Sequence, residues 1–463
     1  MLRSGPAESA IPLLVLLVLL VLAPLPFGAI PFWAQAFLTF CIFALLAAWA
    51  IKPYPSLAAT HPSVLSDSAN RYLYGILTVW SLATAFAFLQ VVPLPPSIIA
   101  VLSPALHELY GWTLPGHGGP DGFWRTLSTT PASTIQSGLL IGACGSAFFL
   151  VAQLCRSRER ILALAVTVVL VGMIEAIYGL ALVGGGLSRP ATGTFINRNH
   201  FAALLAMALC LGLGLLLSAW QAGDRERSSA LPFDRWARTT PLILACLTIL
   251  AGIIFSFSRM GLVAPILTLI LFAGLWMFGP VSNRIRLIGA VVGLVLLLFM
   301  AGAWTAFEVV ADRFRSLEDS YRVAAWEGSY ALFQSFPLAG VGLGGLVDNL
   351  PRFLPVQIPE TFQHSHNEPL EVLAEGGIIY TALIGLGLIV YFGKAVPAWM
   401  RRRDPLARGL GAGCLAGSAA VLLQSLVEFP LRMPANAFYL SVILGMGWAI
   451  IHSPSYSLSS GNK

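Results

Sequence analysis

The sequence predicts an all-α protein that crosses a membrane about a dozen times. Of the 463 residues, 57% are hydrophobic and only 10% are charged, whereas about a quarter of the residues in soluble globular domains are charged. Apolar runs recur from Ile11 to Ile451, and no soluble stretch between them is long enough to form its own core. A single membrane domain over residues 1–463 is therefore expected.

The apolar runs can be divided into spans by length, because a helix needs about 20 apolar residues to cross a bilayer with its backbone paired internally. The candidate spans are residues 11–26, 29–51, 73–92, 133–154, 161–183, 200–219, 241–257, 260–278, 287–306, 370–396, 409–427 and 435–451. The first run could also be a signal peptide, but Pro24 and Pro26 lead directly into the second run without a small-residue cleavage site. An uncleaved helical hairpin is expected there.

The basic residues alternate with the spans and predict the orientation of the chain. Connections rich in Lys and Arg tend to stay in the cytoplasm, and one alternate set, with both termini, holds most of them. Short basic clusters between apolar runs explain the net charge of +6 through topology rather than nucleic-acid binding. Arginines of the opposite, exported set could recognise phosphate, although Lys is scarce in the whole chain. This set has no lysine and consists of Arg125, Arg189, Arg198, Arg259, Arg313, Arg315, Arg322, Arg352 and Arg432.

Two exported connections are long. The first, residues 93–132, is rich in Pro and Gly and is expected to pack over the outer face. The second, residues 307–369, lies between the ninth and tenth spans and is the longest polar stretch. Long loops are usually either functional or disordered, and aromatic residues such as Trp326 and Tyr330 favour an ordered, functional loop.

The end of the second loop predicts a helix that enters the membrane with acidic residues on one face. Pro369 suits a first helical turn, and Asn367 or Glu368 can cap it. Spacings of three and four then place the carboxylates on one side. The side chains concerned are His364, His366, Asn367, Glu368, Glu371 and Glu375.

His366 stands just before the N-terminus of this helix, where the partial positive charge disfavours imidazolium. A neutral imidazole can act as a general base, whereas the plainer interpretation is a histidine that caps the helix or bonds a neighbour. Two histidines spaced by two, with no further ligand spacing, do not predict a metal site. No metal is therefore expected at His364 and His366.

Two arginines on the exported side are candidates for anion binding. Arg259 lies in a tight turn between two apolar runs, where it either snorkels to lipid headgroups or is retained for a ligand. Arg322 precedes a short amphipathic helix in the second loop, and it could instead pair with Glu318 or Glu327. Composition and spacing leave both interpretations open.

Three further features are less specific. The run Gly340–Gly345 lacks the strand and helix of a dinucleotide site and is expected to form a turn near the reacting groups. The connection 192–201 is expected to present Asn197, Arg198, Asn199 and His200 at the membrane surface, with Asn199 as a helix cap. Glu175 lies deep in an apolar run, where a carboxylate is functional or is otherwise paired or protonated.

Several segments of the second half of the chain, in this order, resemble one known family. They are Gly193–Ala202, Phe257–Gly261, Arg322 with Trp326, Pro337–Gly344, and His366–Asn367 followed by Leu370, Glu375 and Gly376. The chain is similar to the O-antigen ligases and polymerases (Wzy_C), which are integral membrane glycosyltransferases that use a lipid-linked glycan. Outside residues 189–377 the similarity is mainly one of hydropathy and span count.

The resemblance implies a helical fold of the C-type glycosyltransferase kind in a bacterial inner membrane. It implies metal-independent glycan transfer from undecaprenyl diphosphate, without a cofactor, to a lipid or glycan acceptor in the periplasm. By the same resemblance, Arg259 and Arg322 hold the diphosphate and His366 activates the acceptor, although the doubled histidine leaves His364 as an alternative. The remaining candidates for substrate binding are Arg198, Asn199, His364, Asn367 and Glu375.

The acceptor is left open by the sequence. Ligation to lipid A core and polymerisation of repeat units use the same machinery and differ in the acceptor. Ligation is favoured slightly, because the His366–Asn367 pair and the single dominant late loop resemble those of the ligases. A transporter is the alternative of another class, but the chain has no evident inverted repeat and one long asymmetric loop. Glycan identity, stereochemistry and oligomeric state cannot be derived from the sequence.

Overall fold

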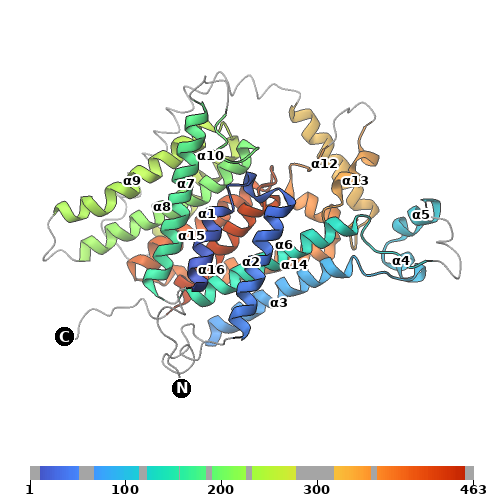
Figure 1. The fold of residues 1–463 in the computed structure, drawn as a ribbon, viewed down its shortest axis with the longest axis horizontal. Helices are drawn as coiled ribbons and strands as arrows, with labels where there is room; N and C mark the ends of the chain where they lie inside the picture. The colour runs from blue at the N-terminus through green and yellow to red at the C-terminus, as the bar shows by residue number, and fades with distance from the viewer. Residues whose placement is uncertain are drawn as a thin grey trace.

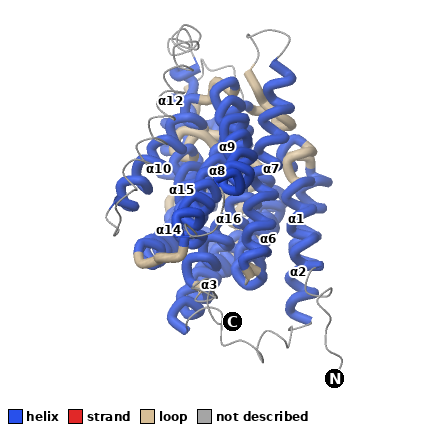
Figure 2. The backbone as a smooth tube through the Cα atoms, turned by 90° about the vertical axis from the view of Figure 1, so that its left-hand side faces the viewer, coloured by secondary structure: helices blue, strands red, loops and turns tan. Residues whose placement is uncertain are grey.

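The structure is a computed structural model that describes residues 11–51, 67–113, 123–155, 157–183, 190–225, 232–277, 318–355 and 362–453. Within these ranges the secondary-structure elements are helices, and the only β-type pairing is an isolated bridge between Leu94 and Arg125. Figure 2 accordingly shows helices and loops in the described part of the chain. The prediction of an all-α architecture is therefore confirmed for these residues.

The helices follow the predicted spans closely (Figure 1). The first half contains α1 (Ile11–Leu22), η1 (Phe27–Ala29), α2 (Phe32–Ile51), α3 (Asp67–Leu89), α4 (Pro96–Leu102), α5 (Pro104–Thr113), α6 (Pro131–Leu154), α7 (Arg158–Val183) and α8 (Arg198–Arg225). The second half contains α9 (Pro232–Phe255), α10 (Arg259–Met277), α12 (Glu318–Ser335), α13 (Leu346–Asn349), η3 (Leu350–Phe353), α14 (Glu368–Met400), α15 (Pro405–Gln424), η4 (Pro430–Arg432) and α16 (Pro434–His452).

Eight of the described helices are long and apolar enough to cross a membrane: α2, α3, α6, α7, α8, α14, α15 and α16. Shorter apolar helices coincide with three more predicted spans, at Ile11–Leu22, Thr239–Phe255 and Arg259–Leu271. The predicted span 287–306 lies outside the described residues, as do Arg189, Arg313 and Arg315. Multiple membrane spans are thus confirmed, while the count of about twelve stays a prediction.

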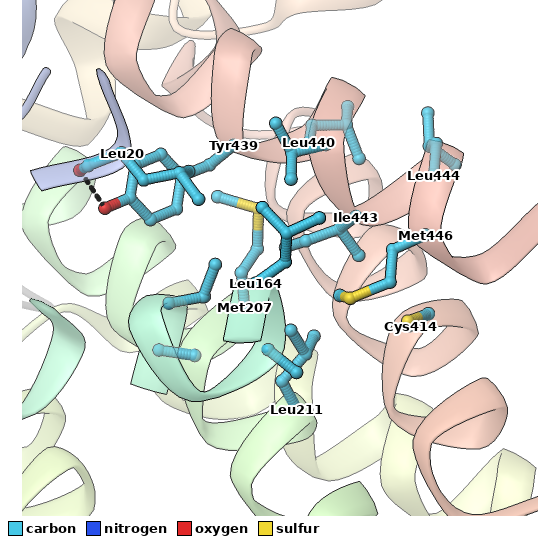
Figure 3. Packing of buried hydrophobic residues seen from close by; sticks show 14 of the residues in the cluster. Leu20, Leu164, Met207, Leu211, Cys414, Tyr439, Leu440, Ile443, Leu444 and Met446 are labelled. Atoms are coloured by element: carbon cyan, nitrogen blue, oxygen red, sulfur yellow. Dashed lines mark hydrogen bonds between the residues drawn. The ribbon is translucent and has the colours of Figure 1, made fainter. Parts of the chain in front are cut away.

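The centre of the bundle is formed by α8, α15 and α16, whose spans are 89%, 83% and 94% buried within the protein. The α3 span is only 22% buried, so most of its apolar surface is available to lipid. Side chains from α1, α7, α8, α15 and α16 interdigitate in the core (Figure 3), where the Tyr439 hydroxyl donates to the Leu20 carbonyl at 2.6 Å. This bond satisfies a buried phenol and ties α16 to α1.

Helices α8 and α15 approach each other through glycines. A Cβ atom on Gly413 of α15 would lie 2.6 Å from the Cys210 carbonyl oxygen of α8. Small residues allow such backbone contact, which is a main source of helix association where lipid is as apolar as the side chains. The α8–α15 pair is therefore a closely packed centre of the bundle.

A second hydrophobic cluster joins the two long loops at one end of the molecule. It includes Ile99 of α4, Leu106 of α5, Leu332 of α12, Leu350 of η3 and Ala374 of α14. Figure 1 shows α4 and α5 at the same end as α12 and α13. The first loop and the described part of the second therefore pack together.

Helix α14 is broken at Gly377, where φ is 63° and ψ is −171°. The break leaves carbonyls and amides without helical partners, and the glycine-rich turn after α12 supplies them. The Glu375 carbonyl accepts from the Gly342 amide at 2.9 Å, and the Ile378 amide donates to the Pro337 carbonyl at 2.9 Å. The predicted span 370–396 lies within this one helix, and the interruption at Gly377 arises because the turn replaces part of the helical pairing. The same contacts place the turn against Glu375, whereas its closeness to reacting groups stays a prediction.

We expect Gly377→Ala to lower the thermal unfolding temperature strongly. The φ and ψ of Gly377 belong to a region that is accessible almost only to glycine, at a cost of about 1–3 kcal/mol for other residues, and a Cβ atom would overlap the Leu338 carbonyl. The matched control is Gly385→Ala in the same helix, since a Cβ atom there meets nothing within 4 Å. The folded fraction of the purified protein is measured by size-exclusion chromatography after heating. The unfolding temperature should fall for Gly377→Ala alone, and equal unfolding temperatures of the two variants would contradict this explanation.

Candidate functional site

Three of the predicted site residues meet at one carboxylate, that of Glu428. This residue lies between α15 and η4 and is only 3% exposed. Its Oε1 accepts hydrogen bonds from Arg322 Nη2 and from Asn199 Nδ2, both at 2.7 Å. Its Oε2 lies 3.2 Å from Nδ1 of His366. The structure thus brings together α8, α12 and the segment before α14 around one negative charge.

The pKa of Glu428 lies below the ordinary value of a glutamate. Burial by itself raises this pKa, but the hydrogen bond with His366 and the guanidinium of Arg322 outweigh the effect of burial. The carboxylate is therefore ionised at neutral pH and can hold both partners through charge-assisted hydrogen bonds.

His366 is held in an unusual backbone conformation next to this carboxylate. Its φ is +54°, in the left-handed region that costs a non-glycine residue about 1–2 kcal/mol. The following residue, Asn367, caps α14 as predicted, because its Oδ1 accepts from the Leu370 amide at 3.1 Å. The Ser365 hydroxyl donates to the Asn367 carbonyl at 2.8 Å and closes the turn. These bonds fix the imidazole at the helix N-terminus and direct Nδ1 to Glu428.

A second charged cluster surrounds Arg432, beside the first. Its Nε lies 3.1 Å from Glu371 Oε1, and its Nη2 lies 2.6 Å from Glu375 Oε2. Glu371 also holds the preceding segment, because its Oε1 lies 2.8 Å from His364 Nδ1 and its Oε2 accepts from the Ser365 amide at 3.0 Å. Burial lowers the pKa of Arg432, but the neighbouring carboxylates outweigh it and raise that pKa above its ordinary value. The carboxylates of α14 therefore share one face and one counter-ion.

The ring of Phe429 contacts three imidazoles, among them one from each of these two clusters. The ring centroids lie 4.1 Å from that of His364, 4.6 Å from that of His200 and 4.9 Å from that of His366. His364 and His366 thus contact the same phenyl ring but bond to different carboxylates, Glu371 and Glu428.

The start of α8 differs from the prediction in two respects. Asn197, not Asn199, supplies the cap, because its Oδ1 accepts from the Asn199 amide at 2.8 Å. Asn199 and His200 were expected at the membrane surface but are buried. The physical reason is that the end of α15 and the connection after it cover them: Gln424, the last residue of α15, donates from Nε2 to the Asn199 carbonyl at 2.8 Å, and the Asn199 side chain turns to Glu428.

Arg259 and Arg198 each begin a helix at this end of the bundle. Arg259 is the first residue of α10, after a turn in which the Ser258 hydroxyl accepts from the Gly261 amide at 3.1 Å. Gly261 packs directly on Ala202 in the first turns of α8. Arg259 is therefore on an element that abuts the helix bearing Asn199, whereas contact of either arginine with a substrate stays a prediction.

Arg322 lies within α12, not before a helix as expected, because the helix already begins at Glu318. Its guanidinium reaches Glu428 rather than its neighbour Glu327, which is exposed on the same helix. Glu175, whose role the sequence left open, is paired: it accepts from the Thr194 amide and hydroxyl, both at 2.9 Å. This carboxylate anchors the connection that leads to α8.

Glu428 and Arg432 were not recognised as site residues from the sequence. The available signal was a short connection, residues 428–434, that contains one acid and one base immediately beside two predicted spans. Ionisable groups at such positions require partners. The pairing itself was not readable, because 229 residues separate Asn199 from Glu428.

The fold and this cluster define a multi-pass membrane protein with a buried, charged centre at the ends of its helices. Residues 244–385 match the family model Wzy_C, which describes O-antigen ligases. This match confirms the predicted resemblance, because residues 244–385 are similar to the O-antigen ligase family. No curated protein sequence matches the chain significantly. The matched region contains Arg259, Arg322 and His366, whereas Asn199 and Glu428 lie outside it.

We expect Arg432→Met to destabilise the protein severely. The substitution would leave the carboxylates of Glu371 and Glu375 buried without their counter-ion, and breaking such a pair costs about 3–5 kcal/mol. Arg352→Met is the matched control, because Arg352 lies exposed on η3. The thermal unfolding temperature should fall for Arg432→Met only, and an unchanged temperature would show that the cluster does not stabilise the fold.

The lowered pKa of Glu428 predicts a pH-dependent contribution to stability. A carboxyl group whose pKa is depressed by folding stabilises the folded state above its ordinary pKa of about 4.3, and this contribution disappears as the pH falls below that value. The difference in unfolding temperature between the wild type and Glu428→Gln should therefore shrink between pH 7 and pH 3.5. Glu327→Gln should follow the wild type throughout, and a difference that stays constant with pH would contradict the assignment.

Proposed function

We propose that the protein transfers a glycan from undecaprenyl diphosphate to an acceptor hydroxyl at the periplasmic face of a bacterial inner membrane. The proposal places both termini in the cytoplasm and residues 307–369 in the periplasm, and it assigns the chain to the C-type glycosyltransferase kind. Ligation to lipid A core is the favoured reaction. The observation that carries the proposal is the shared contact of His366 and Arg322 with Glu428, because it joins a candidate base to a candidate anion-binding group.

The imidazole geometry supports a role as general base. If Nδ1–H of His366 donates to Glu428, the lone pair of Nε2 is the one that can accept a proton. Nε2 would take the proton of the acceptor hydroxyl as its oxygen attacks the anomeric carbon. The bond from that carbon to the diphosphate oxygen then breaks, and its electron pair stays on the diphosphate. General base catalysis of this kind contributes about 10²- to 10⁴-fold.

The leaving diphosphate gains negative charge, which guanidinium groups can stabilise in place of a divalent cation. Arg322 is a suitable group because its side chain is 23% exposed beside the buried Glu428. Arg259, at the neighbouring start of α10, is proposed as the second. We assign a supporting role in the site to Arg198, Asn367 and Glu375. Asn367 caps α14, and Glu375 contacts Arg432.

His366 rather than His364 is proposed as the base. Glu371, the partner of His364, is bound to Arg432, which is itself bound to Glu375. The partner of His366 is bound to Arg322, the guanidinium proposed to meet the donor. Only His366 therefore connects directly to the site of the leaving group, and His364 is proposed to line the acceptor side across Phe429.

We expect His366→Ala to lose glycan transfer by about 10²- to 10⁴-fold with normal membrane insertion. The assay supplies an undecaprenyl diphosphate-linked glycan with either lipid A core or a second lipid-linked chain as the acceptor. His107→Ala on α5 is the matched control and should behave like the wild type. Full activity of His366→Ala would contradict the proposed chemistry, and transfer only between two lipid-linked chains would replace ligation by polymerisation.

A further inference from the structure

The Glu428 carboxylate divides its two oxygens between groups with different proposed tasks. Oε1 receives Arg322 and Asn199, whereas Oε2 faces Nδ1 of His366. The Arg322 nitrogen that donates to Glu428 is Nη2, and the same nitrogen could instead donate to a phosphate oxygen. The other terminal nitrogen of Arg322, Nη1, makes a long contact of 3.5 Å with the Val427 carbonyl.

We propose that Glu428 is a positioning residue that couples binding of the donor to the action of the base. In the free enzyme its charge is shared between Arg322 and His366. A bound diphosphate draws Arg322 away, and the carboxylate then serves His366 alone. This inference rests on the proposed function and adds an order of events to it, in which the donor prepares the base for the acceptor.

The surroundings of Glu428 allow Arg322 to be the partner that leaves. The side chain of Arg322 is 23% exposed, whereas that of Glu428 is 4% exposed, so a ligand reaches the guanidinium more readily than the carboxylate. Asn199 would remain on Oε1 and keep this oxygen hydrogen-bonded after the exchange. A buried acceptor is therefore not left without a partner, which would otherwise oppose the exchange.

The second cluster lacks this freedom and serves as an internal comparison. Glu371 is bound by Arg432 and by the Ser365 amide, and Arg432 is bound at its other end by Glu375. Two carboxylates hold this guanidinium, so a phosphate would have to displace both. The charge beside His364 is consequently fixed, and the charge beside His366 depends on what Arg322 binds.

The orientation of the imidazole gives Glu428 a role that an amide cannot replace. A carboxylate only accepts hydrogen bonds, so it selects the form of His366 with a proton on Nδ1 and a lone pair on Nε2. A glutamine at this position can still accept from Arg322 and Asn199 through its oxygen, but its NH₂ group would donate to Nδ1. The proton of the imidazole would then lie on Nε2, where it blocks the base.

The test compares the wild type with Glu428→Gln in two measurements on the full-length protein in lipid nanodiscs. The first is binding of undecaprenyl diphosphate alone, which should become about three- to tenfold tighter because the carboxylate no longer competes for Arg322. The second is the turnover number for glycan transfer, which should fall by at least about a hundredfold. Glu428→Asp keeps the charge and should have a turnover between the two.

Glu327→Gln, the same change at an exposed position of α12, should leave both measurements unchanged. Binding by Glu428→Gln that is unchanged or weaker would overturn the proposal, and so would an undiminished turnover or a turnover of Glu428→Asp no better than that of the Gln variant. Should Glu428→Gln not fold, Glu428→Asp replaces it, and unchanged binding and turnover there would overturn the proposal. A wild type that binds the diphosphate lipid but transfers no glycan would contradict the proposed function and not the competition at Arg322.

Discussion

The pairing of buried carboxylates with arginines organises the end of the molecule that holds the candidate site. Glu371, Glu375 and Glu428 are each at most 3% exposed, and an isolated charge in so dry an environment is far too costly to persist. Their counter-ions, Arg432 and Arg322, come from other elements, so pairing requires α12, α14 and the connection after α15 to meet. The ion pairs that stabilise the fold thereby also determine the positions of His364 and His366, which contact Glu371 and Glu428.

A broken helix allows this arrangement. The first part of α14 carries the carboxylates, and the glycine-rich turn after α12 takes over the backbone hydrogen bonds at the break. Gln90 at the end of α3 completes the joint, since its Nε2 donates to the carbonyls of Ala339 and Glu375 at 2.7 and 3.1 Å. Irregular backbone at such depth is tolerated where protein surrounds it, and Gln90 is fully buried. The charged segment is thus held at both of its ends.

Local rules predicted the helices and part of the site. Hydropathy located the spans because the bilayer imposes one length on all of them, and cap chemistry predicted Asn367 because the cap involves only its neighbours. Glu428 could not be predicted in the same way, since its importance arises from partners on three distant elements. The burial of His200 and the break at Gly377 were missed for the same reason, because each is caused by a segment that is remote in the sequence.

The close contact between α8 and α15 has a mechanical consequence. Both helices lead to the charged centre: α8 begins with the turn that holds Asn199, and α15 ends shortly before Glu428, while Gln424 clasps the two ends together. Because a helix is stiff, a displacement near its middle also moves its end. A larger side chain at Gly413 would push α8 and α15 apart and weaken the contacts that hold the Glu428 carboxylate. The geometry of the charged centre is thus set partly by a glycine that does not touch it.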